Sequence, residues 1–173
     1  LTGHGVLSTL HTNNSIGVRP RWINMGVEKY LIAPSLVLAA AQRLLRKLCE
    51  TCRIPVDLTP SEKKIIEDAV KKMTSDIQAT IPQAPYSIFK AGEGCKECGN
   101  KAYKGRIAIF EALEVTAEVE RVILSGISEE KLREVAEQQG MLTMYQDGII
   151  KVLRGITSME ELLQVAQQEG SEE

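Results

Sequence analysis

The spacing of apolar residues in the first half of the chain predicts one short strand followed by three helices. The strand covers residues 5–10, and the helices cover residues 15–24, 28–48 and 60–73. The third helix follows a capping box, because Thr59 can accept from the first turn and Glu62 can reach back to it. The second helix would carry Arg43, Arg46 and Lys47 on a basic face, which we expect to be solvated.

The second half of the chain combines strands with a run of helices. Alternating apolar residues predict strands at 86–89 and 106–115, and Glu111 is the exception to the alternation. Helices are then predicted after the caps Thr116 and Ser128, over residues 142–155, and after a capping box of Thr157 and Glu160. Residues 170–173 are expected to be frayed. The pattern as a whole predicts a helix-rich α/β protein.

Composition narrows the function classes without selecting one. Hydrophobic residues make up 43% of the chain and aromatic residues 4%, which suits a core of aliphatic side chains. The formal net charge of −2 provides no general attraction to nucleic acid, so no nucleic-acid partner is expected. The longest nearly apolar run, residues 30–41, is too short to span a bilayer.

The first residues of the chain are not expected to form a secretory leader. Residues 1–4 lack the basic start and the apolar run of a secretory leader, so a reducing cytoplasm is the expected compartment. Strand-like sequence begins already at residue 5, which favours a chain that begins inside a domain.

All the cysteines of the chain lie in two CxxC pairs, Cys49 with Cys52 and Cys95 with Cys98. Two such pairs can complete a tetrahedral four-thiolate zinc site. The alternatives are two disulfides or four unrelated buried thiols, and the spacing outside a secreted context favours zinc. No base or nucleophile stands beside the cysteines, so we expect the zinc to be structural and to clip a loop onto a larger domain.

Polar residues follow the first predicted strand. In open α/β sheets, ligands bind beyond the carboxyl ends of strands, and Thr9, His11, Thr12 and Asn13 occupy that place. Their side chains can hydrogen-bond a phosphate. The alternative is that His11 only caps the following helix, with Asn13 or Asn14 as its N-cap, and a lone His-Thr pair favours this simpler interpretation.

Residues 3–13 read Gly-His-Gly-Val-Leu-Ser-Thr-Leu-His-Thr-Asn, which is similar to the histidine box of the secretion and pilus-assembly ATPases. These are the hexameric motors of type II secretion and type IV pilus extension. Further similar stretches follow in the family's order at residues 25–28, 41–44, 48–49, 94–98, 103–106, 147–148 and 155–158. Departures such as Lys29, where proline is common in the family, and residues 99–102 remove neither a histidine nor a cysteine.

The resemblance implies the carboxyl-terminal portion of a RecA-like P-loop ATPase domain, with a tetracysteine zinc-binding subdomain and a helical tail. The implied division is residues 1–48 for the ATPase core, 49–106 for the zinc subdomain and 107–173 for a strand and the helical part. The P-loop patterns GxxxxGKS and GxxxxGKT are absent from the chain. The resemblance therefore places ATP and Mg²⁺ binding in the full-length parent, and this chain is expected to be inactive alone.

The resemblance also implies roles for individual residues and partners. His11 would sense the γ-phosphate with support from Thr9 and Thr12, and His4 would be a second, cofactor-side histidine. Arg19 and Arg21 would lie near a subunit interface. The implied partners are further copies in a homohexamer, an inner-membrane platform protein and cytoplasmic pilus or secretion components. The implied place is the inner face of the cytoplasmic membrane.

Two alternatives to the extension motor remain. The chain could be a stand-alone zinc-stabilised interaction module without catalysis, as its missing P-loop favours. It could also come from a retraction motor of the same superfamily, which the four-cysteine loop disfavours because those relatives usually lack it.

Overall fold

The computed structural model describes residues 3–126 and 128–169, and it divides into two compact units. Unit 1 comprises Leu1–Ala41 and Glu111–Met141, and unit 2 comprises Gln42–Phe110 and Leu142–Glu173. The predicted fraying of residues 170–173 lies outside the described residues. The three-part division inferred from the resemblance stays a prediction.

Unit 1 packs four helices around an aliphatic core. They are α1 (Val18–Asn24), α2 (Lys29–Ser35), α5 (Ala117–Ser125) and α6 (Glu129–Gln138). Helices α2 and α5 pack against each other, and α6 packs against α5. The shared core consists of aliphatic side chains that are almost fully buried, among them Ile16, Ile32, Leu113, Val119, Ile123 and Leu132.

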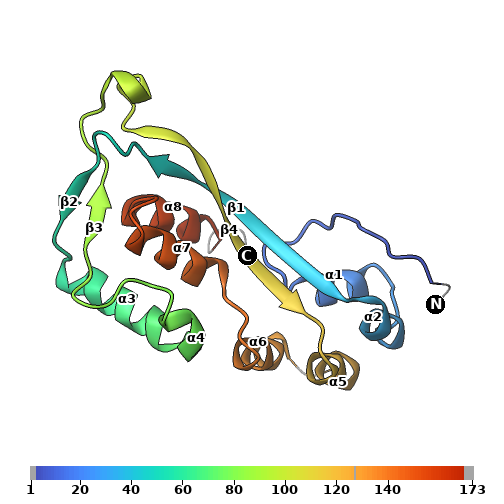
Figure 1. Cartoon of the computed structure of the whole chain (residues 1–173). Helices are drawn as coiled ribbons and strands as arrows, with labels where there is room; N and C mark the ends of the chain where they lie inside the picture. The colour runs from blue at the N-terminus through green and yellow to red at the C-terminus, as the bar shows by residue number, and fades with distance from the viewer. Residues whose placement is uncertain (1–2, 127, 170–173) are drawn as a thin grey trace. The chain divides into compact units, whose positions relative to one another are not determined.

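Two long strands, β1 (Leu38–Leu48) and β4 (Tyr103–Glu114), pair with each other (Figure 1). Residues 38–41 and 111–114 of these strands belong to unit 1, and their other residues belong to unit 2. The predicted helix at 28–48 is therefore wrong beyond its first turns. Helix α2 ends at Ser35. Pro34 lies in its last turn and has no amide hydrogen to donate to the Tyr30 carbonyl, which weakens the helix at this end. The chain then becomes extended because β4 supplies hydrogen-bond partners, and local apolar spacing does not show such a distant partner.

The predicted strand at residues 5–10 is also absent. Residues 4–12 have no regular secondary structure, and Val6 and Leu7 are exposed. Among the described residues, no strand pairs with this segment. Alternating sequence alone does not make a strand, because the backbone needs a neighbouring edge to hydrogen-bond.

No helix among the described residues is long and apolar enough to cross a membrane.

Unit 2 combines a small sheet with helices. Strands β2 (Ile54–Val56) and β3 (Ile88–Lys90) pair antiparallel, with Ile54 opposite Lys90. The helical elements are α3 (Pro60–Lys71), α4 (Ser75–Gln78), the short 3₁₀ helix η1 (Lys96–Cys98), α7 (Met144–Leu153) and α8 (Met159–Glu169). Helix α7 packs against α3 and α8. A Cβ on Gly148 would lie 2.3 Å from Leu162 Cδ1, so glycine allows α7 and α8 their close approach.

The helix caps test the local predictions. The capping box is confirmed: the Glu62 amide donates to Thr59 Oγ1 (3.3 Å) and the Thr59 amide donates to Glu62 Oε2 (2.9 Å). Thr116 and Ser128 also accept from the first turns of their helices. The predicted cap at Thr157 is wrong by one position. Ser158 Oγ accepts from the Glu161 amide (3.3 Å), while Thr157 Oγ1 donates to the Arg46 carbonyl (2.8 Å).

Candidate functional site

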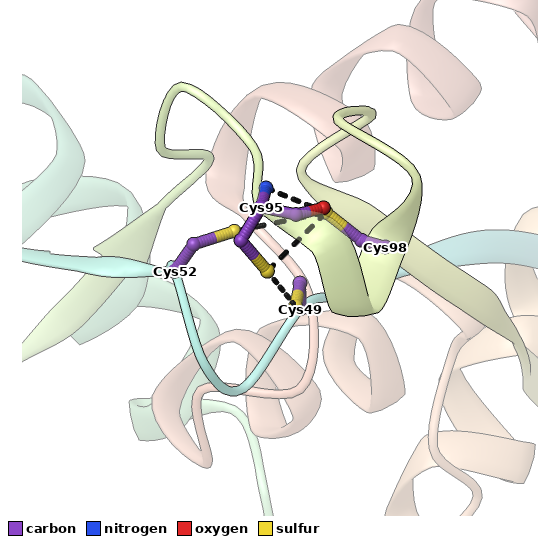
Figure 2. A group of neighbouring side chains, drawn as sticks. All are labelled: Cys49, Cys52, Cys95 and Cys98. Atoms are coloured by element: carbon purple, nitrogen blue, oxygen red, sulfur yellow. Dashed lines mark hydrogen bonds between the residues drawn. The ribbon is translucent and has the colours of Figure 1, made fainter.

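The four cysteines lie together on two turns of unit 2. Cys49 and Cys52 lie on the turn between β1 and β2, where the Arg53 amide donates to the Cys49 carbonyl at 2.9 Å. Cys95 and Cys98 lie on the turn that contains η1. Figure 2 shows the four side chains converging from both turns, and all four sulfurs lie within 4.8 Å of one another. The four-cysteine cluster is therefore confirmed as a group able to hold one metal ion.

The distances between sulfurs fit a tetrahedral zinc ion. Four sulfurs at about 2.3 Å from a central zinc are about 3.8 Å apart. The Sγ–Sγ distances are 3.7 Å for Cys49 and Cys95, 3.9 Å for Cys52 and Cys98, and 3.8 Å for Cys95 and Cys98. All four thiols are free, and a disulfide bond would need sulfurs at about 2.05 Å. A site in which protein thiolates fill all four ligand positions would suit a structural metal.

Backbone amides prepare part of the cluster for a metal. The Cys95 amide donates to Cys98 Sγ at 3.2 Å, and this bond, with those from Lys101 and Ala102, lowers the pKa of Cys98 to about 6. Burial raises the pKa of Cys52 to about 12, and its neighbouring thiols add to the rise. A metal has to displace protons from its thiol ligands, so Cys98 would bind as a ready thiolate and Cys52 would lose its proton on binding.

Glycines let the two turns close on each other. A Cβ on Gly92 would lie 2.0 Å from the Cys52 carbonyl oxygen, and no backbone atom can yield by that much. Gly94 has φ +99°, and its Cβ would lie 2.6 Å from the carbonyl carbon of Asn100. Larger residues at either position would force the cysteine turns apart.

The first cysteine turn is also tied to the helical end of unit 2. The Cys49 amide donates to the Ala102 carbonyl and the Leu48 amide donates to the Ile156 carbonyl, both at 2.9 Å. Arg53 donates to the Gly155 carbonyl and lies 4.3 Å above the Phe89 ring. The cysteine cluster therefore shares hydrogen bonds with the turn between α7 and α8.

Arg46, three residues before Cys49, forms an ion pair with Glu161. Its Nε and Nη2 donate to Glu161 Oε2 (2.9 and 2.6 Å), and its amide donates to Oε1 (3.0 Å). Its guanidinium lies 4.2 Å from the centre of the Tyr103 ring. Arg46 was predicted on a solvated face, and its side chain is 53% exposed, but the Glu161 carboxyl holds its guanidinium in place. The partners lie far apart in the chain, so helical spacing could not pair them.

We expect Glu161→Gln to lower the free energy of unfolding by about 1.5–3 kcal/mol at pH 7. Burial raises the pKa of the Glu161 carboxyl, but the hydrogen bonds from Arg46 outweigh burial and leave the pKa below its usual value. A lowered pKa gives stability that is present above about pH 4.3, the unfolded value, and lost as the pH falls through the native pKa. The free energy of unfolding, measured in urea, should therefore differ clearly between Glu161→Gln and the wild type at pH 7. At pH 3 the difference should be small.

Glu67→Gln is the matched control for this experiment. Glu67 is 43% exposed and lies 4.0 Å from Lys63, so its loss should change the free energy of unfolding by less than about 0.5 kcal/mol. Equal losses for the two variants, or a Glu161→Gln loss that does not shrink in acid, would contradict the role of the Arg46–Glu161 pair.

The histidine segment, residues 3–15, belongs to unit 1 and lies outside the helices and strands. His4, Thr9 and His11 are exposed and Thr12 is half-buried, and they follow one another along the irregular stretch before α1. The Thr12 amide donates to the Leu10 carbonyl at 3.1 Å. The Asn14 side chain, not His11, accepts from the Gly17 amide (2.8 Å) and so makes the local turn into α1. The structure leaves the imidazole of His11 accessible to a ligand.

The two arginines of α1 differ in burial. Arg19 is 7% exposed, and its guanidinium lies beside Gly126 at the end of α5. Arg21 is exposed. Arg21 is therefore the better placed of the two for a subunit interface, and that role stays a prediction for both.

Comparisons with known proteins identify similar sequences over almost the whole chain. The profile of the family described as "Type II/IV secretion system protein" matches residues 1–164. The chain is 39% identical over 94% of its length to "Type IV pilus assembly ATPase PilB" of Thermus thermophilus, of which it covers 17%. It is 36% identical over 98% of its length to "Type II secretion system protein E" of Pseudomonas aeruginosa, of which it covers 31%. A PilB of Myxococcus xanthus is 36% identical over 94% of the chain and is covered to 27%.

Proposed function

This chain belongs to the type II/IV secretion system protein family, and we propose that it is the carboxyl-terminal part of a hexameric motor ATPase. The motor would couple ATP hydrolysis to the assembly of pilins or pseudopilins at the inner membrane. The supporting observation is the family match over residues 1–164, with relatives named as pilus assembly and secretion proteins. The chain spans less than a third of the length of these relatives. ATP hydrolysis would therefore be an activity of the longer parent protein.

The histidine segment would supply one edge of the ATP site in the parent. His11 would donate a hydrogen bond to a γ-phosphate oxygen, and Thr9 and Thr12 would hold the segment against the phosphates. His4 would stand on the same side of the nucleotide. The accessible position of His11 supports this role, since neither imidazole has a hydrogen-bond partner among the described residues.

The four-cysteine cluster would hold a structural zinc ion. Zinc would bind all four thiolates and fix the two turns to each other, without taking part in hydrolysis. The shared hydrogen bonds of Cys49, Leu48 and Arg53 with their neighbours would pass this rigidity to the turn between α7 and α8.

The parent would work in the cytoplasm, at the inner face of the cytoplasmic membrane. It would assemble with further copies of itself and with an inner-membrane platform protein, and it would contact cytoplasmic components of the pilus or secretion system. Its attachment to the membrane would run through those partners. The chain has a formal net charge of −2, so we expect no nucleic acid among them.

We expect the chain alone to hydrolyse ATP no faster than the buffer background. Its sequence contains no GxxxxGKS or GxxxxGKT loop to cradle the phosphates, and phosphoryl transfer depends on such electrostatic stabilisation. The measurement is release of phosphate from Mg-ATP by the purified chain, beside the full-length parent at equal molar concentration. The parent should show magnesium-dependent turnover.

The same comparison separates the motor from a stand-alone zinc module. An inactive chain with an active parent supports the motor proposal. Magnesium-dependent hydrolysis by the chain alone that His11→Ala abolishes would contradict the division of the site. An inactive full-length parent with a loaded zinc site would favour the interaction module.

A further inference from the structure

Glu111 is a buried carboxyl in a strand of otherwise apolar inward positions. It interrupts the alternation of β4, and it is 3% exposed. Its neighbours at the same face, Ile109 and Leu113, are also buried. A charged side chain among aliphatic residues costs free energy unless donors surround it. The groups that donate hydrogen bonds to Glu111 therefore indicate the role of this residue.

The principal partner of Glu111 is the residue that ends the histidine segment. Glu111 Oε1 accepts from the Ser15 amide at 3.0 Å and from Ser15 Oγ at 2.7 Å. Ser15 is 1% exposed and follows His11 by four residues. Hydrogen bonds to a charged acceptor are shorter and stronger than those between neutral groups. This pair fixes the exit of the histidine segment to β4.

Other contacts support the carboxylate and the turn. Arg133 Nη1 lies 4.0 Å from Glu111 Oε2, and Ser15 Oγ lies 4.0 Å from Met141 Sδ. The Asn14 side chain accepts from the Gly17 amide at 2.8 Å. Two successive residues, Asn14 and Ser15, are therefore held by side-chain hydrogen bonds just after the accessible His11.

We propose that Glu111 is a positioning residue for His11, acting through Ser15 to set where the histidine segment presents its imidazole. This inference rests on the proposed role of His11 at the γ-phosphate. Before Asn14 the segment has no regular structure, so its anchored end limits where His11 can reach. A hydrogen-bond donor misplaced by about 1 Å can cost a large factor in the rate of a reaction.

The first test measures amide hydrogen exchange of the full-length parent. We expect Glu111→Ala to raise exchange in the peptide that covers residues 9–17 by about tenfold or more, because the Ser15 amide loses its acceptor. Glu161→Ala is the matched control. It removes another buried carboxyl with three hydrogen bonds, in unit 2, and it should leave exchange at 9–17 unchanged.

The second test measures ATP hydrolysis per folded motor. We expect Glu111→Ala to lower turnover by about tenfold or more, while the dissociation constant for ATP stays within about threefold. Glu111→Gln keeps an acceptor oxygen for both Ser15 donors, so it should recover turnover to within about threefold of the wild type. Recovered turnover in Glu111→Gln would show that turnover depends on the hydrogen bonds to Ser15 and not on the ion pair with Arg133.

A double variant tests whether Glu111 acts through His11. If it does, Glu111→Ala combined with His11→Ala should be no slower than His11→Ala alone. Additive losses would overturn the proposal, and so would wild-type exchange at residues 9–17 in Glu111→Ala. Failure of the proposed function would show differently, as wild-type turnover in the single His11→Ala variant.

Discussion

Removing zinc should lower the melting temperature of the chain by about 8–16 °C. A ligand present at about 1,000 times its dissociation constant adds about 4 kcal/mol to the free energy of unfolding. For a chain of this size, each kcal/mol moves the melting temperature by about 2–4 °C. Because all four cysteines belong to unit 2, we expect the transition of that unit to move.

The measurement combines elemental analysis with calorimetry. Protein purified without added metal should contain one zinc per chain, and a strong chelator should remove the zinc and shift the melting curve. Cys95→Ser should reproduce the chelated protein, since it deletes one of the four ligands. Addition of zinc should restore the wild-type chain and fail to restore the variant.

Thr51→Ala is the matched control for the cysteine variant. Thr51 lies between Cys49 and Cys52, its side chain is exposed, and the substitution keeps the backbone amide that supports the Cys49 thiolate. We expect full zinc content and an unchanged melting temperature. Metal-free wild-type protein with four titratable thiols and the same melting curve would overturn the zinc site. Protection of the thiols without metal would favour disulfides.

In the full-length parent, His11→Ala should lower ATP hydrolysis by about 10- to 150-fold. The loss of one hydrogen bond to a charged group costs about 1.5–3 kcal/mol where that bond is made, and each 1.36 kcal/mol is a factor of about ten in rate. The bond would form fully only as charge shifts on the γ-phosphate during hydrolysis, and it would be absent with ADP, so losing it should slow turnover more than it weakens ATP binding. We expect ATP to bind with nearly normal affinity.

The experiment compares turnover, ATP affinity, zinc content and melting temperature in the same variants. His11→Ala should keep its zinc and its melting temperature, because the imidazole is exposed and has no partner among the described residues. Ser8→Ala changes an exposed neighbour of the same segment and should leave turnover unchanged. Cysteine variants should instead fail through lost stability.

Two outcomes would contradict the sensor role. Wild-type turnover from a well-folded His11→Ala parent would show that the imidazole contributes nothing to hydrolysis. A lower melting temperature with unchanged turnover per folded motor would show that His11 only packs or caps.

Local chemistry in the sequence predicted several features correctly. The capping box at Thr59 and Glu62 formed as expected because both partners lie within one helical turn. The two CxxC pairs also indicated their cluster, since a metal-binding group has a short local spacing and each pair forms its own turn. The carboxyl-terminal helices followed from apolar spacing and from the caps Thr116 and Ser128.

In two other segments, local sequence patterns predicted the wrong secondary structure because the structure depends on pairing with distant residues. Residues 38–48 have helical spacing, but they form β1 because β4 lies alongside them. Residues 5–10 alternate like a strand, and no strand among the described residues pairs with them. In both cases the partners of the backbone hydrogen bonds decide the structure. For residues 38–48 these partners lie far away in the chain, and for residues 5–10 no such partner strand is present among the described residues.

The sequence by itself determined the cysteine cluster, most of the helices and the family. Each of these depends on residues within a few positions of one another, or on an ordered set of motifs. Only the tertiary structure decided the pairing of β1 with β4, the ion pair of Arg46 with Glu161 and the hold of Glu111 on Ser15. A buried charge is stable only beside its donors, and the folded chain alone brings such distant donors within hydrogen-bond distance.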